Sequence, residues 1–196
     1  QKYTFQIYED TLYFAPGDPS SGTGLTAYNI KNREYLWNLS AVINPAYWYS
    51  VPAIENNSLY IGTNLPFVDG FLFTYYSIDR NTGEVNWMSE IESELAEGIS
   101  LNTQNMIFDY SELLDYMAPS IWRNLLIITT GDRKVRALNK HTGANEWELS
   151  FEYHTSSSPT VAGNRVYFGI DGNDSPLYGS LGDVPGLEIN KASGTV

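Results

Sequence analysis

Apolar and polar residues alternate in short runs along most of the chain, and Gly, Asn, Asp or Pro ends each run. The segment 125–147 shows this most clearly, because its two apolar runs stop at Gly131-Asp132 and at His141-Thr142-Gly143 before Trp147 is reached. Period-two alternation between turn formers is typical of strands in a half-buried sheet. The pattern therefore predicts an all-β protein made of short antiparallel strands.

Two features recur at a fixed phase and indicate internal repeats. A polar turn with Thr-Gly precedes Trp87 and again Trp147, a version without Gly precedes Trp37, and Ser193-Gly194-Thr195 repeats the turn once more. A Pro also opens a short strand in each unit, at Pro52, Pro119 and Pro159. Trp37, Trp87 and Trp147 lie 50 and 60 residues apart (87 − 37 and 147 − 87), which is typical of four-stranded propeller blades.

We call the four strands of each repeat A to D. The repeats predict that residues 1–196 form a single partial propeller domain. We predict three complete blades and a fourth without strand D, at about 2–40, 50–91, 117–153 and 157–196. The three Trp residues fall on strand D at equal phase, and we expect each to pack against the neighbouring blade.

The order of these motifs resembles the PQQ-type β-propeller repeat, named for pyrroloquinoline quinone (PQQ) dehydrogenases. The resemblance rests on Ser158-Pro159-x-Val161, on Val166-Tyr167-x-Gly169 and on Leu138-x-x-x-Thr142-Gly143-x-x-x-Trp147. It implies a propeller of seven or eight blades, so four blades are expected to be part of a larger or incomplete ring. Many members bind no quinone, and this chain is most similar to the branch of outer-membrane assembly factors and surface proteins.

In such a meander, A–B and C–D turns share one end of the disc, here called the turn face, and B–C and D–A connections share the other, the loop face. The turn-face connections are all tight. The loop-face connections vary in length and comprise 16–24, 64–70, 131–132 and 171–185 between strands B and C, and 44–49, 89–117 and 153–156 between blades. Binding residues are expected on the loop face, because variable loops on a rigid scaffold commonly carry function.

Aromatic residues and a histidine on these connections are the candidate ligand-binding or partner-binding residues. They are Tyr47, Trp48, Tyr49, Tyr153 and His154. Exposed aromatic rings can stack on sugars, cations or peptide side chains, although a loop that packs on its own blade is the plainer interpretation of Trp48. His141 falls on the turn face, where a solvated imidazole is expected. The two His residues come with no Gly-x-Ser-x-Gly motif, so hydrolase chemistry is not indicated and no catalytic residue is assigned.

The connection 89–117 is strongly acidic. It carries seven Asp or Glu residues and no Lys or Arg, and we predict two short helices in it, from Ser89 to Gly98 and from Asp109 to Met117. A solvated lid is the plainer interpretation and an acidic patch for a basic partner is the alternative.

In the last B–C loop, Asp171, Asn173 and Ser175 place oxygen atoms at alternate positions, as in a calcium loop, but Pro176 and Gly182 break that motif. A weak Ca²⁺ site is thus the only metal site considered.

The charge balance narrows the choice of partners. The 23 acidic residues outnumber the 11 Lys and Arg residues and give a net charge of −12, which disfavours nucleic acids and anionic lipid surfaces. No apolar run approaches the roughly 18 residues of a spanning helix, so membrane insertion is not expected. The chain starts at Gln1 without Met, which fits a processed protein of the periplasm or cell surface but also an N-terminus that was trimmed artificially. It contains no Cys, so the redox compartment stays open and a disulfide framework or a Cys-ligated metal is excluded.

These observations leave three functional hypotheses. The first is a non-enzymatic scaffold that binds a protein or glycan partner through the loop face and needs no cofactor. The second is a fragment of a PQQ-dependent alcohol or sugar dehydrogenase, for which the resemblance implies a calcium ion held by Glu and Asn, a catalytic Asp, a Trp under the quinone and commonly a Cys pair. The absence of Cys argues against it. The third is a structural subunit that self-associates through open propeller edges.

Overall fold

The computed structural model describes residues 3–16, 24–40, 48–67, 70–94, 117–130, 132–151, 157–169 and 187–190. These residues form sixteen β-strands and no helix. The first sheet contains β1 (Tyr3–Tyr8), β2 (Thr11–Pro16), β3 (Thr26–Asn29) and β4 (Glu34–Asn38). The second contains β5 (Trp48–Tyr49), β6 (Ala53–Glu55), β7 (Ser58–Phe67), β8 (Gly70–Asp79) and β9 (Val85–Glu94). The third contains β10 (Ser120–Trp122), β11 (Leu125–Thr130), β12 (Lys134–Asn139) and β13 (Asn145–Ser150), and the fourth contains β14 (Thr160–Ala162), β15 (Arg165–Phe168) and β16 (Leu187–Asn190).

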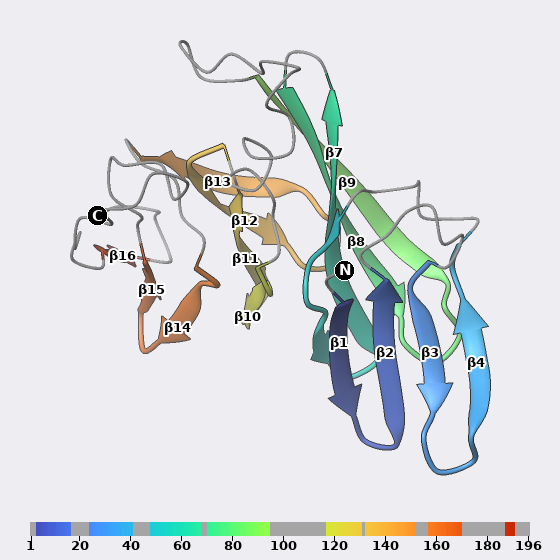
Figure 1. Cartoon of the computed structure of the whole chain (residues 1–196). Coiled ribbons are helices and arrows are strands. Elements are labelled where there is room, and N and C mark those ends of the chain that lie inside the picture. Colours follow the sequence, from blue (N-terminus) through green and yellow to red (C-terminus); the bar gives the residue numbers. More distant parts are fainter. Residues whose placement is uncertain are drawn as a thin grey trace, which may run out of the picture.

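Each sheet is an antiparallel meander, and the four sheets follow one another as propeller blades (Figure 1). In the second blade, β5 and β6 both pair with β7, so strand A is divided in two around residues 50–52. The described part of the fourth blade has three strands. The all-β partial propeller expected from the repeats is therefore confirmed.

Three expectations about the second blade are wrong. Residues from Ser89 to Glu94 are not helical, because β9 continues through them as the partner of β8. The expected B–C loop at 64–70 is a continuation of the β7–β8 ladder, with only Val68-Asp69 between the strands. Trp48 is not in a loop, because it belongs to the short strand β5 and pairs there with Asn64 of β7. The helix expected at 109–117 lies outside the described residues except for Met117, which is not helical.

The hydrophobic core lies between successive blades, because alternate residues of each strand face opposite neighbours. Tyr13 and Ala27 of the first blade pack against Leu59, Ile61 and Ile78 of the second. Equivalent clusters join the second blade to the third and the third to the fourth. The positive φ angles of Glu9, Asn56, Arg123 and Gly163 mark the A–B turn of each blade and fix this register. Leu126 is therefore equivalent to Leu59.

Tryptophan residues of strand D join each blade to the next, as expected for Trp37 and Trp87. The indole Nε1 of Trp37 donates to the carbonyl of Arg80 at 3.0 Å, and that of Trp87 donates to the carbonyl of Lys140 at 2.8 Å. The indole rings lie on Gly83 and Gly143, which have φ angles of +78° and +75°. A Cβ atom on Gly143 would lie 2.7 Å from Cε3 of Trp87, so glycine is required there for its small size as well as its conformation.

The first residue of the C–D turn, directly after strand C, forms a second joint between blades. Arg80 of the second blade forms an ion pair with Glu9 of the first at 3.1 Å and stacks on Tyr8, 4.6 Å from the ring centroid. Lys140 of the third blade forms an ion pair with Glu55 of the second. Both joints lie on the turn face, so that end of the disc is occupied by contacts that hold the blades together.

Candidate binding face

A three-stranded ribbon extends from the loop face of the second blade. Strands β7, β8 and β9 each contain ten residues, whereas β11, β12 and β13 of the third blade each contain six. The additional pairs run from Asn64↔Phe73 to Phe67↔Gly70, and from Phe73↔Ile91 to Gly70↔Glu94. Figure 1 shows these strands running well beyond the ends of β1–β4. We refer to Asn64–Phe67, Gly70–Phe73 and Ile91–Glu94 as the ribbon.

The ribbon contacts a buried ion pair of the third blade close to the end of β9. The guanidinium group of Arg136 contacts both carboxylate oxygens of Asp132 in the B–C turn, with Nη1 at 3.0 Å from Oδ1. The side chains are only 2% and 5% exposed, respectively. Asp132 also accepts a hydrogen bond from Thr130 and forms one with Ser93 at the end of β9. The ribbon is thus held, one ladder pair from its end, by a carboxylate of the neighbouring blade.

Two further hydrogen bonds bring the partnered N–H groups of Arg136 to four of its five. Its Nη1 donates to Thr130, and its Nε donates to Glu148 at 3.2 Å, while Lys134 binds the other oxygen of Glu148 at 2.8 Å. Because the Arg136 side chain is only 2% exposed and most of its donors are paired within the protein, we interpret the cluster as structural. The sequence offered one signal for it that was not recognised: an Arg at an inward position of the apolar strand KVRAL.

Hydrogen bonding changes the acidity of this cluster. Burial alone would raise the pKa of Asp132, but the hydrogen bonds and positive charge of Arg136, with hydrogen bonds from Thr130 and Ser93, bring it below its usual value. A hydrogen bond from Lys134 and the charge of Arg136 also lower the pKa of Glu148. Both carboxylates are therefore more acidic in the folded protein than in the unfolded chain.

We expect the stability from Asp132 to be lost in acid. The unfolded chain takes up the proton first, near the ordinary Asp pKa of about 3.9, so the contribution is complete above that pH and falls as the pH drops through the lower folded pKa. Urea unfolding of the wild type and of Asp132→Asn from pH 7 to pH 3 tests this. The wild type should lose more stability than the variant across the acid range, and parallel curves would contradict the assignment.

Most of the residues predicted for binding fall outside the described part of the chain. The residues outside the described part are Tyr47, Tyr153 and His154, together with Asp171, Asn173 and Ser175 of the predicted calcium site. The backbone of Trp48 and Tyr49 is described, and β5 pairs with Asn64 and Thr63 where the ribbon begins. The structure therefore brings this aromatic segment next to the ribbon, which sequence reasoning had not connected to it. His141 lies exposed in the C–D turn on the turn face, as expected.

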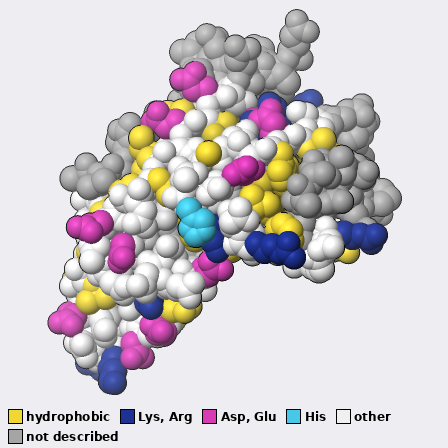
Figure 2. Space-filling view, turned by 180° about the vertical axis from the view of Figure 1, so that it is seen from behind, with side chains coloured by type: hydrophobic (Ala, Val, Ile, Leu, Met, Phe, Trp, Pro, Cys, Tyr) yellow, Lys and Arg dark blue, Asp and Glu magenta, His cyan; other side chains and the backbone are white. Residues whose placement is uncertain are grey.

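The described residues contain no cluster of three or more His, Asp or Glu side chains that could hold a metal ion. Within the same residues, no helix has the length and apolarity needed to cross a membrane. On the face that Figure 2 shows, the acidic side chains of the described residues are spread out rather than gathered in one patch. Among the described residues, the feature that distinguishes the loop face is thus the extended ribbon.

Several solved structures share this fold at low sequence identity. BamB from Moraxella catarrhalis is 14% identical with a TM-score of 0.57, and the match covers 94% of this chain and 47% of BamB. A quinohemoprotein alcohol dehydrogenase from Pseudomonas putida HK5 is 14% identical with a TM-score of 0.61, over 97% of this chain and 33% of the enzyme. The WD40 propeller domain of Doa1 is 14% identical with a TM-score of 0.56, over 86% of this chain and 47% of that chain.

These three similarities establish the propeller fold, and the chain spans less than half the length of each of the three proteins. No curated protein matches the sequence. The model of the family described as outer membrane protein assembly factor BamB matches residues 74–179, which is more than half of the 196 residues. The same segment carries the PQQ-type repeat motifs and the Trp87–Gly143 joint. The chain therefore belongs to the BamB family of PQQ-like β-propellers.

Proposed function

We propose that the chain is a non-enzymatic binding module of an exported or cell-surface protein and that it engages its partner through the loop face. One observation carries the proposal: the turn face is occupied by joints between blades, whereas the ribbon extends from the opposite face. A rigid scaffold with one elaborated face is the usual arrangement for binding by loops or hairpins. The extracytoplasmic location rests on the family description, an outer membrane protein assembly factor.

A protein partner is favoured over a glycan because of the ribbon. Beyond Asn64, β7 has a described ladder partner only on the β8 side, so the backbone of its other edge can pair with an added strand. The ribbon sequence includes Leu65, Phe67 and Phe71, which would suit an extended apolar segment. The aromatic segment at Trp48 begins at the same place and would add contacts. A glycan partner would instead depend on the aromatic rings.

The dehydrogenase alternative shares the fold but lacks support from the described residues. The Trp37 and Trp87 rings lie on Gly83 and Gly143 of the adjoining blades, so neither ring is available as a floor for quinone. The solved relatives include both BamB and a quinohemoprotein dehydrogenase, and the family match is to the assembly factor. Stoichiometric retention of PQQ by the purified protein in the presence of Ca²⁺, read from its absorbance, would overturn the non-enzymatic proposal.

Shortening the ribbon tests the proposed binding face. Replacing residues 65–72 with Asn-Gly should close a tight hairpin after the pair Asn64↔Phe73 and leave the blade intact. The probes are a urea-unfolded outer-membrane β-barrel protein, diluted onto the immobilised chain, and a glycan array. We expect the wild type to bind the β-barrel protein and the shortened variant to bind at least tenfold more weakly.

His141→Ala serves as the control, because His141 lies exposed on the turn face. Its binding should equal that of the wild type. Trp48→Ala should weaken binding without unfolding the protein. Equal binding by the wild type and the shortened variant would contradict the loop-face assignment, and binding only to the glycan array would replace the protein partner with a glycan.

A further inference from the structure

Strand β9 is the last strand of the second blade, and one side of its backbone has no described partner. It ends the order β5-β7-β8-β9 and pairs only with β8 among the described strands. The backbone N–H of Asp79 in β8 donates to the carbonyl of Glu84 at 2.8 Å. Because backbone groups alternate in direction along paired strands, the N–H and C=O groups of Met88, Glu90 and Glu92 point away from β8. We refer to these three residues as the β9 edge.

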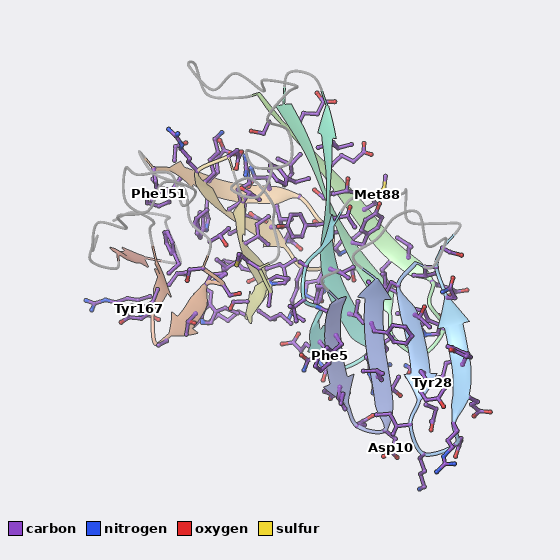
Figure 3. The ribbon with its side chains drawn as sticks, viewed as in Figure 1. Phe5, Asp10, Tyr28, Met88, Phe151 and Tyr167 are labelled. Atoms are coloured by element: carbon purple, nitrogen blue, oxygen red, sulfur yellow. The ribbon has the colours of Figure 1, made fainter. Side chains whose placement is uncertain are left out.

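The side chains of the β9 edge are exposed to solvent. Trp87 and Ser93, at the alternate positions of the strand, contact the third blade, so the side chains of the β9 edge point away from that blade. Met88 is 54% exposed, and Glu90 and Glu92 are exposed as well. Figure 3 labels Met88 on the side of β9 that lies away from β10–β13. The β9 edge therefore presents one apolar side chain and then two carboxylates, at every second position.

The two carboxylates lack the cations that the third blade provides on its equivalent strand. On β13, Glu148 binds both Lys134 and Arg136 of the adjacent strand β12. Strands β7, β8 and β9 contain no Lys or Arg. Neither Glu90 nor Glu92 forms an ion pair with a described residue. The carboxylates of the β9 edge therefore have no opposite charge within their own sheet.

A strand added to the β9 edge would place its side chains directly beside these carboxylates. Opposite residues of paired strands lie about 4.5–5.5 Å apart, so opposite charges attract there and like charges repel. Lys or Arg at two alternate positions would supply the missing charge, and an apolar residue would fit against Met88. A strand with acidic residues at those positions would be rejected by repulsion.

We propose that the β9 edge is a strand-addition site selective for an extended protein segment with Lys or Arg at alternate positions. This inference rests on the binding role proposed above and names the charge of the segment that the ribbon accepts. Main-chain hydrogen bonds would hold the segment, and the carboxylates would select it. Edge-to-edge pairing of two copies is disfavoured, because it brings the carboxylates of both chains together.

Alternating decapeptides test the charge preference, with Lys-Val, Ser-Val and Glu-Val repeats as the probes. Fluorescence anisotropy at low ionic strength should show the Lys-Val peptide binding about tenfold more tightly than the other two, and added salt should weaken it. Glu90→Gln combined with Glu92→Gln should reduce the Lys-Val affinity about tenfold. Glu34→Gln combined with Glu146→Gln removes the same charge from exposed positions on β4 and β13, and should bind as the wild type does. Circular dichroism establishes that both double variants fold.

N-methylated versions of the Lys-Val peptide separate strand pairing from charge attraction alone. Methyl groups on the Lys amides block one edge of the peptide, and methyl groups on the Val amides block the other, without changing its charge. One version should bind as the unmodified peptide does and the other about tenfold more weakly, because only one edge of the peptide faces β9. Equal binding by the two versions would show attraction without strand pairing and would overturn the proposal.

The outcomes distinguish this inference from the proposed function. If the wild type bound the three unmodified peptides equally, charge selection at the β9 edge would be refuted, whereas weaker binding of the β-barrel protein by the shortened ribbon would still support the loop face. Selective binding of the Lys-Val peptide without any binding of the β-barrel protein would support the β9 edge and refute only that choice of partner.

Discussion

Replacing Gly143 with Ala should lower the free energy of unfolding by about 2–5 kcal/mol. The left-handed conformation costs a non-glycine residue about 1–2 kcal/mol, and forcing atoms into a filled core costs about 1–3 kcal/mol more. Both costs apply, because Gly143 has a φ angle of +75° and its added Cβ would lie 2.7 Å from Trp87. Urea unfolding followed by circular dichroism measures the change.

Gly163 provides a matched control for this substitution. Its φ angle is +56°, so Ala there has the same backbone cost, but nothing lies within 4 Å of the added Cβ. Gly163→Ala should therefore cost only about 1–2 kcal/mol. Equal losses for the two variants would show that the indole contact does not determine the need for glycine at position 143.

Replacing Arg136 with Met should have the other large effect, a loss of about 3–5 kcal/mol of stability, because it leaves a buried carboxylate without its partner. Asp132 is only 5% exposed and depends on Arg136 for its charge compensation. The double variant Arg136→Met with Asp132→Leu should recover most of the loss, since no unpaired charge then remains.

Lys134→Met is the control for Arg136. Lys134 forms an ion pair with Glu148 at 2.8 Å, but the side chains are 31% and 40% exposed. Such a pair typically contributes about 0–1 kcal/mol. If Lys134→Met destabilised the protein as much as Arg136→Met, burial would not be the cause of the large effect.

The repeated pattern was sufficient to predict the blades because period-two alternation and the Trp phase both depend on local spacing. The error at Ser89–Glu94 arose from composition. Glu90 and Glu92 favour a helix by propensity, yet they alternate with Ile91 and Ser93, and β8 supplies a ladder partner for each of them. Tertiary pairing overrode the propensity.

The ribbon was missed for a related reason. Pro66 and Gly70 are typical of a loop, but beyond Asn64 strand β7 has a described partner on one side only, and an edge position tolerates proline. The contact of Asp132 with Ser93 could not be predicted either, because these residues are 39 positions apart in the sequence (132 − 93). Only the stacking of successive blades brings them together.

The tryptophan joints also determine where the chain could be shortened. Each of the first three hydrogen-bonded sheets ends with its own strand D. In the first two, the indole of that strand also packs on the C–D turn of the next blade. A fragment that ends after β9 would contain a complete sheet and leave Trp87 uncovered, whereas one that ends after Gly143 would cover it. The segment that completes the packing around each tryptophan therefore ends later in the sequence than the hydrogen-bonded sheet does. A stable minimal fragment should end within the next blade, after its C–D turn, rather than between two blades.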